Sequence, residues 1–153
     1  MRFIGITGGV GAGKSEILGY LAKKPDTRVM LADEIAHELM SPGMECYDRI
    51  CETFGAEDIF LPQGGLDRGK LAAVIFSDEA KRRQMNAIVH PAVRVYVEKE
   101  AAREKQGGKR KLLVLEAALL IEEHYDEICD ELWYIYTRED IRRERLMASR
   151  GYS

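Results

Sequence analysis

The chain has 153 residues, of which 46% are hydrophobic, so it is long enough to form one hydrophobic core but too short for two large ones. Its 23 Lys and Arg residues nearly balance 26 Asp and Glu residues, and a net charge of -3 argues against a nucleic-acid binder that relies on bulk positive charge. Three scattered cysteines argue against a disulfide scaffold, and no apolar run reaches the roughly 18 residues of a membrane span. We therefore expect a cytoplasmic α/β protein that binds neither nucleic acid nor membrane.

Short apolar segments alternate with helical patterns near both ends of the chain. Four of these segments have the continuous hydrophobicity of strands that are covered on both faces. They are residues 3–7, 28–31, 111–115 and 132–136. Helical patterns follow three of them, at residues 14–23, 33–40 and 137–148. Strands that alternate with helices in this way predict a parallel sheet.

The strand pattern disappears between residues 44 and 106. Helices are expected there at residues 44–54, 67–76, 78–89 and 91–105. Pro91 separates the last two, because proline normally ends a helix. The sequence therefore predicts an α/β core, residues 1–43 and 107–137, that is interrupted by a helical insert, residues 44–106.

A phosphate-binding pattern lies between the first strand and the first helix. Gly8 and Gly13 enclose four residues and are followed by Lys14 and Ser15. Glycines let successive backbone N–H groups point at phosphate oxygens, and the helix N-terminus adds partial positive charge. The lysine of such a loop contacts the β- and γ-phosphates of ATP, and the hydroxyl binds Mg²⁺. The alternative is a glycine-rich turn that binds nothing.

This loop predicts the P-loop NTPase fold, in which a parallel sheet forms the middle of three layers and helices cover both faces. The residues expected to bind the nucleotide are Gly9, Gly11, Ala12, Gly13, Lys14, Ser15 and Glu16.

Two carboxylates follow strands of the predicted sheet. Asp33 comes shortly after the second strand, and Glu116 ends the third. Ligands of such sheets bind outside the carboxyl ends of the strands, so Asp33 is expected to face the γ-phosphate. A carboxylate there can accept the proton of an attacking hydroxyl group. The alternative for Asp33 is an ordinary helix N-cap.

Beyond these motifs, the whole chain resembles the dephospho-CoA kinase family. The segments that carry the resemblance are residues 5–15, 32–37, 66–68, 85–91, 119–122 and 145–147, with Leu71 and Phe76. The resemblance implies an ATP- and Mg²⁺-dependent transferase that phosphorylates the ribose 3′-hydroxyl of dephospho-CoA, the last step of coenzyme A biosynthesis. It also implies a small-molecule substrate, and we expect a monomer.

The same resemblance implies roles for individual residues. Asp33 would be the general base and would contact the substrate, and Lys14 would act in catalysis. The expected lid residues are Arg142, which would bind the nucleotide, and Arg145, which would stabilise charge on the transferred phosphoryl group. Substrate contacts are expected from Asp33, Arg68, His90, Arg94 and Glu122, and metal contacts from Ser15 and Glu116.

Some features of the sequence differ from the family pattern. Glu116 stands where an aspartate is usual, so it can contact the metal directly or through a bound water. Residues 138–153 resemble only the start of the lid. We therefore expect the chain to be a piece of a longer enzyme, with weak or absent turnover.

Two other functions are compatible with the P-loop. One is a nucleoside monophosphate kinase, which needs paired arginines for the acceptor phosphate. The other is a regulatory nucleotide-binding module without turnover. The lack of an Asn-Lys-x-Asp segment, which reads guanine in GTPases, argues against a GTPase switch.

Overall fold

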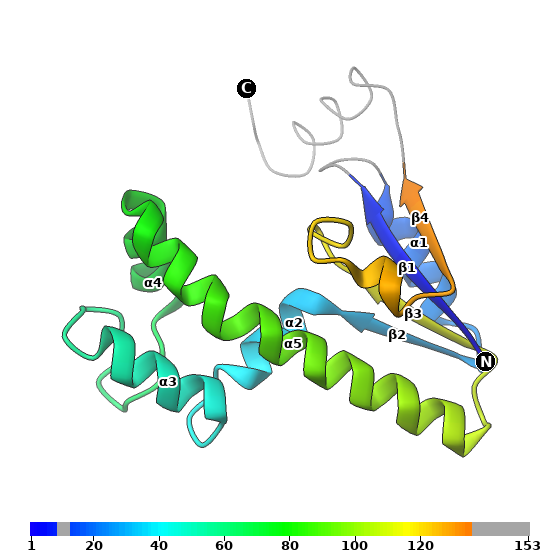
Figure 1. Cartoon of the computed structure of the whole chain (residues 1–153), viewed down its shortest axis with the longest axis horizontal. Coiled ribbons are helices and arrows are strands. Elements are labelled where there is room, and N and C mark those ends of the chain that lie inside the picture. The colour runs from blue at the N-terminus through cyan, green and yellow to red at the C-terminus, as the bar shows by residue number, and fades with distance from the viewer. Residues whose placement is uncertain (9–12, 136–153) are drawn as a thin grey trace. The chain divides into compact units, whose positions relative to one another are not determined.

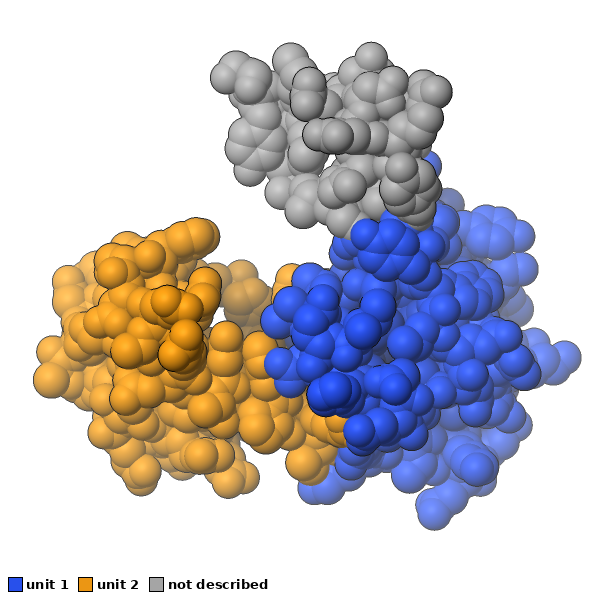
Figure 2. Space-filling view, turned by 45° about the horizontal axis from the view of Figure 1, so that its top comes forward, with its two compact units in different colours: residues 1–32, 98–153 blue, residues 33–97 orange. Residues whose placement is uncertain are grey.

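The computed structural model describes residues 1–8 and 13–135. The chain divides into two compact units: unit 1 is residues 1–32 and 98–153, and unit 2 is residues 33–97 (Figure 2). This division differs from the expected boundaries of the insert at 44 and 106. Almost all of α2 (Ala32–Leu39) belongs to the helical unit, and the end of α5 (Glu79–Gly107) belongs to the sheet unit.

Unit 1 contains a four-stranded parallel sheet within the described residues. Its strands are β1 (Arg2–Gly8), β2 (Thr27–Leu31), β3 (Leu112–Glu116) and β4 (Glu131–Ile135), in the order β2-β3-β1-β4. Helix α1 (Lys14–Ala22) lies on one face, and the connection with the 3₁₀-helix η1 (Tyr125–Glu127) lies on the other (Figure 1). The predicted parallel α/β sheet is thus confirmed, whereas the helix expected at 137–148 lies outside the described residues.

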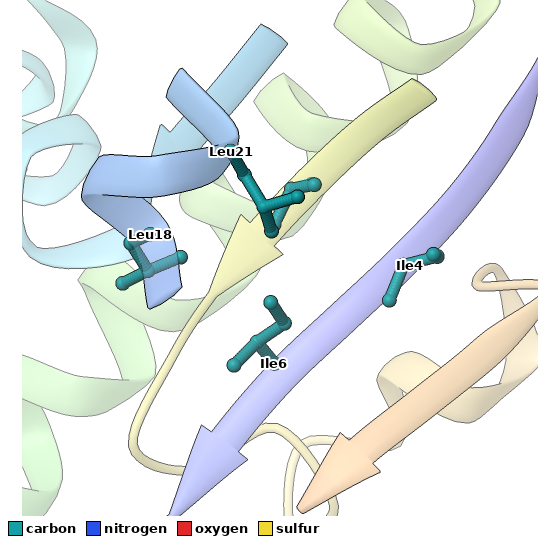
Figure 3. Packing of buried hydrophobic residues seen from close by; sticks show 5 residues of the cluster. Ile4, Ile6, Leu18 and Leu21 are labelled. Carbon is teal, nitrogen blue, oxygen red and sulfur yellow. The ribbon is translucent and has the colours of Figure 1, made fainter. Parts of the chain in front are cut away.

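The core of unit 1 forms because β1 is apolar on both faces. Ile4 and Ile6 share one face and pack with Leu18 and Leu21 of α1 (Figure 3). On β1, Gly5 is in close contact with the η1 connection. A Cβ atom at this position would lie 2.7 Å from Leu120 Cδ2 and 3.2 Å from Cys129 Sγ. Burial raises the pKa of the Cys129 thiol to about 12, so this cysteine is an apolar filler rather than a nucleophile.

Unit 2 is helical within the residues that the structure describes. It comprises most of α2, α3 (Glu45–Phe54), α4 (Arg68–Ser77) and the first part of α5. The Asp67 carboxylate caps α4 by accepting a hydrogen bond from the Lys70 backbone N–H at 3.1 Å. Helices α3 and α5 are linked where the Cys46 thiol donates to the Ile88 carbonyl at 3.9 Å. No described helix is both long and apolar enough to cross a membrane.

The predicted helix break at Pro91 is wrong, because α5 continues through it without interruption. Pro91 is exposed, so the lost backbone hydrogen bond and the distortion of the helix both lie on the face of α5 that contacts solvent. The buried face instead continues across it, since Ile88, Val89, Val93 and Val97 recur at helical spacing. Burial of that face therefore outweighs the local cost of proline.

Replacing Pro91 with alanine should raise the free energy of unfolding by about 2 kcal/mol, because the helix regains a backbone hydrogen bond. The gain is partly offset by the greater freedom of the unfolded chain. Urea unfolding followed by circular dichroism measures the change. A decrease in stability would show that the helix depends on the bend at proline.

Candidate active site

The phosphate-binding pattern occupies the turn from β1 to α1. The structure describes its two ends, Gly8 and Gly13–Ser15, whereas Gly9, Gly11 and Ala12 lie outside the described residues. Gly13 has a φ of 96°, a left-handed conformation that favours glycine, and it immediately precedes α1. At the other end, a Cβ atom on Gly8 would lie 2.6 Å from the Ile135 carbonyl oxygen. Both fixed glycines of the pattern are thus required by the backbone itself.

Substitution of Gly8 by alanine should destabilise unit 1 by about 2 kcal/mol or more and weaken ATP binding, because the backbone of β4 blocks the added methyl group. Gly19 is the matched control, since nothing lies within 4 Å of its Cβ position on α1. Gly19→Ala should raise stability by about 0.5–1 kcal/mol. Thermal unfolding and ATP titration of the two variants test this, and equal behaviour would contradict it.

The lysine of the loop forms an ion pair with the carboxylate at the end of β3. The distance from Lys14 Nζ to Glu116 Oε1 is 3.1 Å, and the two side chains are 20% and 17% exposed. Glu116 is in register with Ile6 of β1 and Leu31 of β2. Beyond it, the Ala117 N–H donates to the Ile6 carbonyl at 3.2 Å. The start of α1 and the end of β3 therefore bring the lysine and the carboxylate together at the sheet edge where ligands of such folds bind.

The residues expected to hold a metal have suitable chemistry. Ser15 is exposed in the first turn of α1, and Glu116 supplies a second oxygen at the end of β3. Mg²⁺ prefers oxygen ligands and usually keeps several waters and substrate phosphates in its coordination shell. Within residues 1–8 and 13–135, no group of three or more His, Cys, Asp and Glu could hold a metal by itself. Ser15 and Glu116 therefore fit a metal ion that binds together with the nucleotide, whose phosphates supply further oxygen ligands.

Asp33 is exposed in the first turn of α2 and follows the end of β2 by two residues. It is also the first residue of unit 2. The carboxylate lies near the N-terminus of the helix, where the helix dipole is positive. An exposed carboxylate two residues after a strand is accessible to the hydroxyl group of a substrate.

The expected substrate residues occupy different elements. Arg68 begins α4 and lines a cavity of about 380 Å³ in unit 2, which His37 also lines. His90 and Arg94 are four residues apart on α5 and therefore share a face. Glu122 is exposed in the connection between β3 and β4. Arg142 and Arg145 lie outside the described residues.

Apart from Arg68, the residues that line this cavity were not among the sites predicted from the sequence. Met40 and Ala72 also line the cavity, and neither carries a chemical signal of its own. One signal was available, because His37 follows Asp33 by four residues and so lies one helical turn away on the same face.

Comparison with known proteins shows which family of P-loop proteins includes this chain. The family profile of dephospho-CoA kinase matches residues 2–153. The chain belongs to this family. The dephospho-CoA kinase of Oceanobacillus iheyensis is 41% identical over 150 residues, which cover 98% of this chain and 74% of that protein. The dephospho-CoA kinase of Symbiobacterium thermophilum is 37% identical over 153 residues, and this chain spans 63% of its length.

Solved structures support the same dephospho-CoA kinase fold. A structure from Thermus thermophilus has a TM-score of 0.77 at 28% identity. The matched region is 99% of this chain and 74% of the Thermus thermophilus chain. The dephospho-CoA kinase from Campylobacter jejuni has a TM-score of 0.70 at 20% identity. The matched region is 100% of this chain and 75% of the Campylobacter jejuni chain. The predicted family and the α/β P-loop fold are confirmed.

Proposed function

We propose that the chain transfers the γ-phosphoryl group of ATP to the ribose 3′-hydroxyl of dephospho-CoA, with ADP and CoA as products. Membership of the dephospho-CoA kinase family supports this function. The Lys14–Glu116 pair at the carboxyl end of β3 is the observation that carries it, because a phosphate-binding lysine is available where the triphosphate of ATP would enter.

In this reaction each group of the chain has a distinct task. Lys14 leaves Glu116 to contact the β- and γ-phosphates, and the N–H groups of the loop hold the same phosphates. Ser15 and Glu116 would hold Mg²⁺, which neutralises charge on the phosphates when it is bound. Asp33 accepts the proton of the 3′-hydroxyl as that oxygen attacks the γ-phosphorus and the bond to the β-phosphate oxygen breaks. Positioning of the two substrates supplies most of the acceleration.

The remaining assignments complete the proposal. Residues 44–106 bind the acceptor, to which Arg68, His90, Arg94 and Glu122 contribute contacts. Residues 138–153, which lie outside the described residues, are assigned to the start of a lid on the family resemblance, with Arg142 as a nucleotide contact and Arg145 as the residue that stabilises the transferred phosphoryl group. The enzyme acts as a monomer in the cytoplasm.

An ADP-release assay with a series of acceptors tests the proposed function. Dephospho-CoA with Mg-ATP should give the highest rate, and nucleoside monophosphates should give no more than the background hydrolysis. Faster release with a nucleoside monophosphate would replace the proposed acceptor. ATP binding with no acceptor-dependent release would instead favour a regulatory module without turnover.

A further inference from the structure

Unit 2 contains a cavity that none of the proposed catalytic steps uses. Its volume is about 380 Å³, within the roughly 300–1,000 Å³ range of small-molecule sites. The end of α2, the turn after it, the segment before α4 and α4 itself contribute its walls. Most of the wall is apolar, including Met40, Pro42, Leu66 and Leu71. A ligand of this cavity must therefore carry apolar groups.

Three polar side chains interrupt the apolar wall, those of Arg68, His37 and Ser41. The Ser41 hydroxyl already donates to the His37 carbonyl at 3.2 Å. In the part of the chain that the structure describes, no hydrogen bond or ion pair involves the Arg68 guanidinium or the His37 ring. Both residues are exposed, so these groups are available to a ligand. A guanidinium group is suited to a phosphate group, because its N–H donors match the phosphate oxygens.

Helix α2 connects the proposed general base with this cavity inside one unit. Asp33, His37 and Met40 recur at helical spacing on one face, opposite the buried Ile35. The backbone remains helical to Met40, whose N–H donates to the Ala36 carbonyl at 3.1 Å. Seven residues of helix span about 10 Å. When the hydroxyl group of an acceptor lies at Asp33, the acceptor atoms that are about 10 Å from that hydroxyl therefore reach the cavity.

We propose that this cavity holds the pantetheine arm of dephospho-CoA, with Arg68 beside the diphosphate. The proposal rests on the proposed function. The ribose and diphosphate separate the 3′-hydroxyl from the arm by a distance comparable to that between Asp33 and Met40. The arm itself carries a gem-dimethyl group and a thioethyl end, which suit the apolar wall, and amides that can hydrogen-bond to His37. Helix α2 therefore carries the general base and also lines the site that recognises the arm of the acceptor.

Titration of the chain with dephospho-CoA, followed through ¹³C-labelled methionine methyl groups, tests this proposal. Met40 lines the cavity, whereas Met30 of β2 and Met85 of α5 are buried elsewhere and serve as internal controls. Dephospho-CoA should shift the Met40 resonance and leave those of Met30 and Met85 nearly unchanged. ATP alone should not shift Met40.

A matched pair of variants on α4 provides the second arm of the same experiment. Ala72 lines the cavity and Ala73 does not, and both are exposed. Ala72→Trp should weaken the binding of dephospho-CoA at least about tenfold by filling the cavity, while Ala73→Trp should leave it unchanged. Arg68→Gln, which does not fill the cavity, should weaken binding about threefold. ATP affinity should be the same in all three variants.

The outcomes separate this proposal from the proposed function. Binding of dephospho-CoA that is equal in Ala72→Trp and Ala73→Trp, or that leaves Met40 unshifted, would overturn the pantetheine site and leave the kinase function intact. Failure of dephospho-CoA to bind wild-type chain that binds ATP would overturn the proposed acceptor, and the cavity assignment with it.

Discussion

Asp33→Asn should reduce turnover with dephospho-CoA by about 100-fold or more while ATP affinity stays the same. Asparagine preserves the shape of the side chain but cannot accept the proton of the 3′-hydroxyl. Asp33 is exposed, so the substitution should leave the stability of unit 2 nearly unchanged. Initial rates of ADP release and ATP titrations on the same preparation give both quantities.

Glu34→Gln is the matched control for this result. Glu34 is the next residue of the same helical turn, is also exposed, and loses the same charge on substitution. A general effect of charge at the start of α2 would lower turnover equally in both variants. Selective loss in Asp33→Asn indicates proton transfer, and retained turnover in that variant would remove Asp33 from the mechanism.

Lys14→Met should also lower turnover by about 100-fold or more, because a charge that stabilises the transferred phosphoryl group is lost. ATP affinity should fall as well, which distinguishes this variant from Asp33→Asn. The substitution leaves the largely buried Glu116 without its cationic partner, at a cost of about 2 kcal/mol in unfolding free energy. Steady-state kinetics and urea unfolding measure the two effects separately.

The double variant Lys14→Met/Glu116→Gln separates chemistry from stability. It removes the unpaired carboxylate, so it should recover most of the lost unfolding free energy without recovering turnover. Lys111→Met is the surface control, because Lys111 is exposed and its contact with Asp26 is long, at 3.9 Å. Recovery of turnover in the double variant would show that Lys14 acts only through the fold.

The strands and the phosphate-binding loop could be predicted because their signals are local. Continuous apolar segments identify strands that are covered on both faces, as in β1, where Ile4 and Ile6 pack under α1. The pattern from Gly8 to Ser15 similarly identifies a turn whose glycines are needed by the backbone, as the contact of Gly8 with Ile135 shows. Resemblance to the dephospho-CoA kinase family then supplied the acceptor, which no local pattern could.

Features that depend on packing between distant segments could not be predicted. Pro91 was expected to end a helix, but burial of Val89 and Val93 on the opposite side keeps the helix continuous. The pairing of Lys14 with Glu116 joins residues that are 102 positions apart. The cavity near Arg68 depends on the relative packing of α2 and α4, which the sequence does not specify.

Phosphorus NMR of the complete reaction mixture tests the central claim most directly. After incubation with Mg-ATP and dephospho-CoA, the account predicts a new phosphomonoester resonance coupled to the ribose 3′-proton, in amounts equal to the ADP formed. Inorganic phosphate in place of that resonance, or a phosphomonoester at any other position, would contradict transfer to the 3′-hydroxyl.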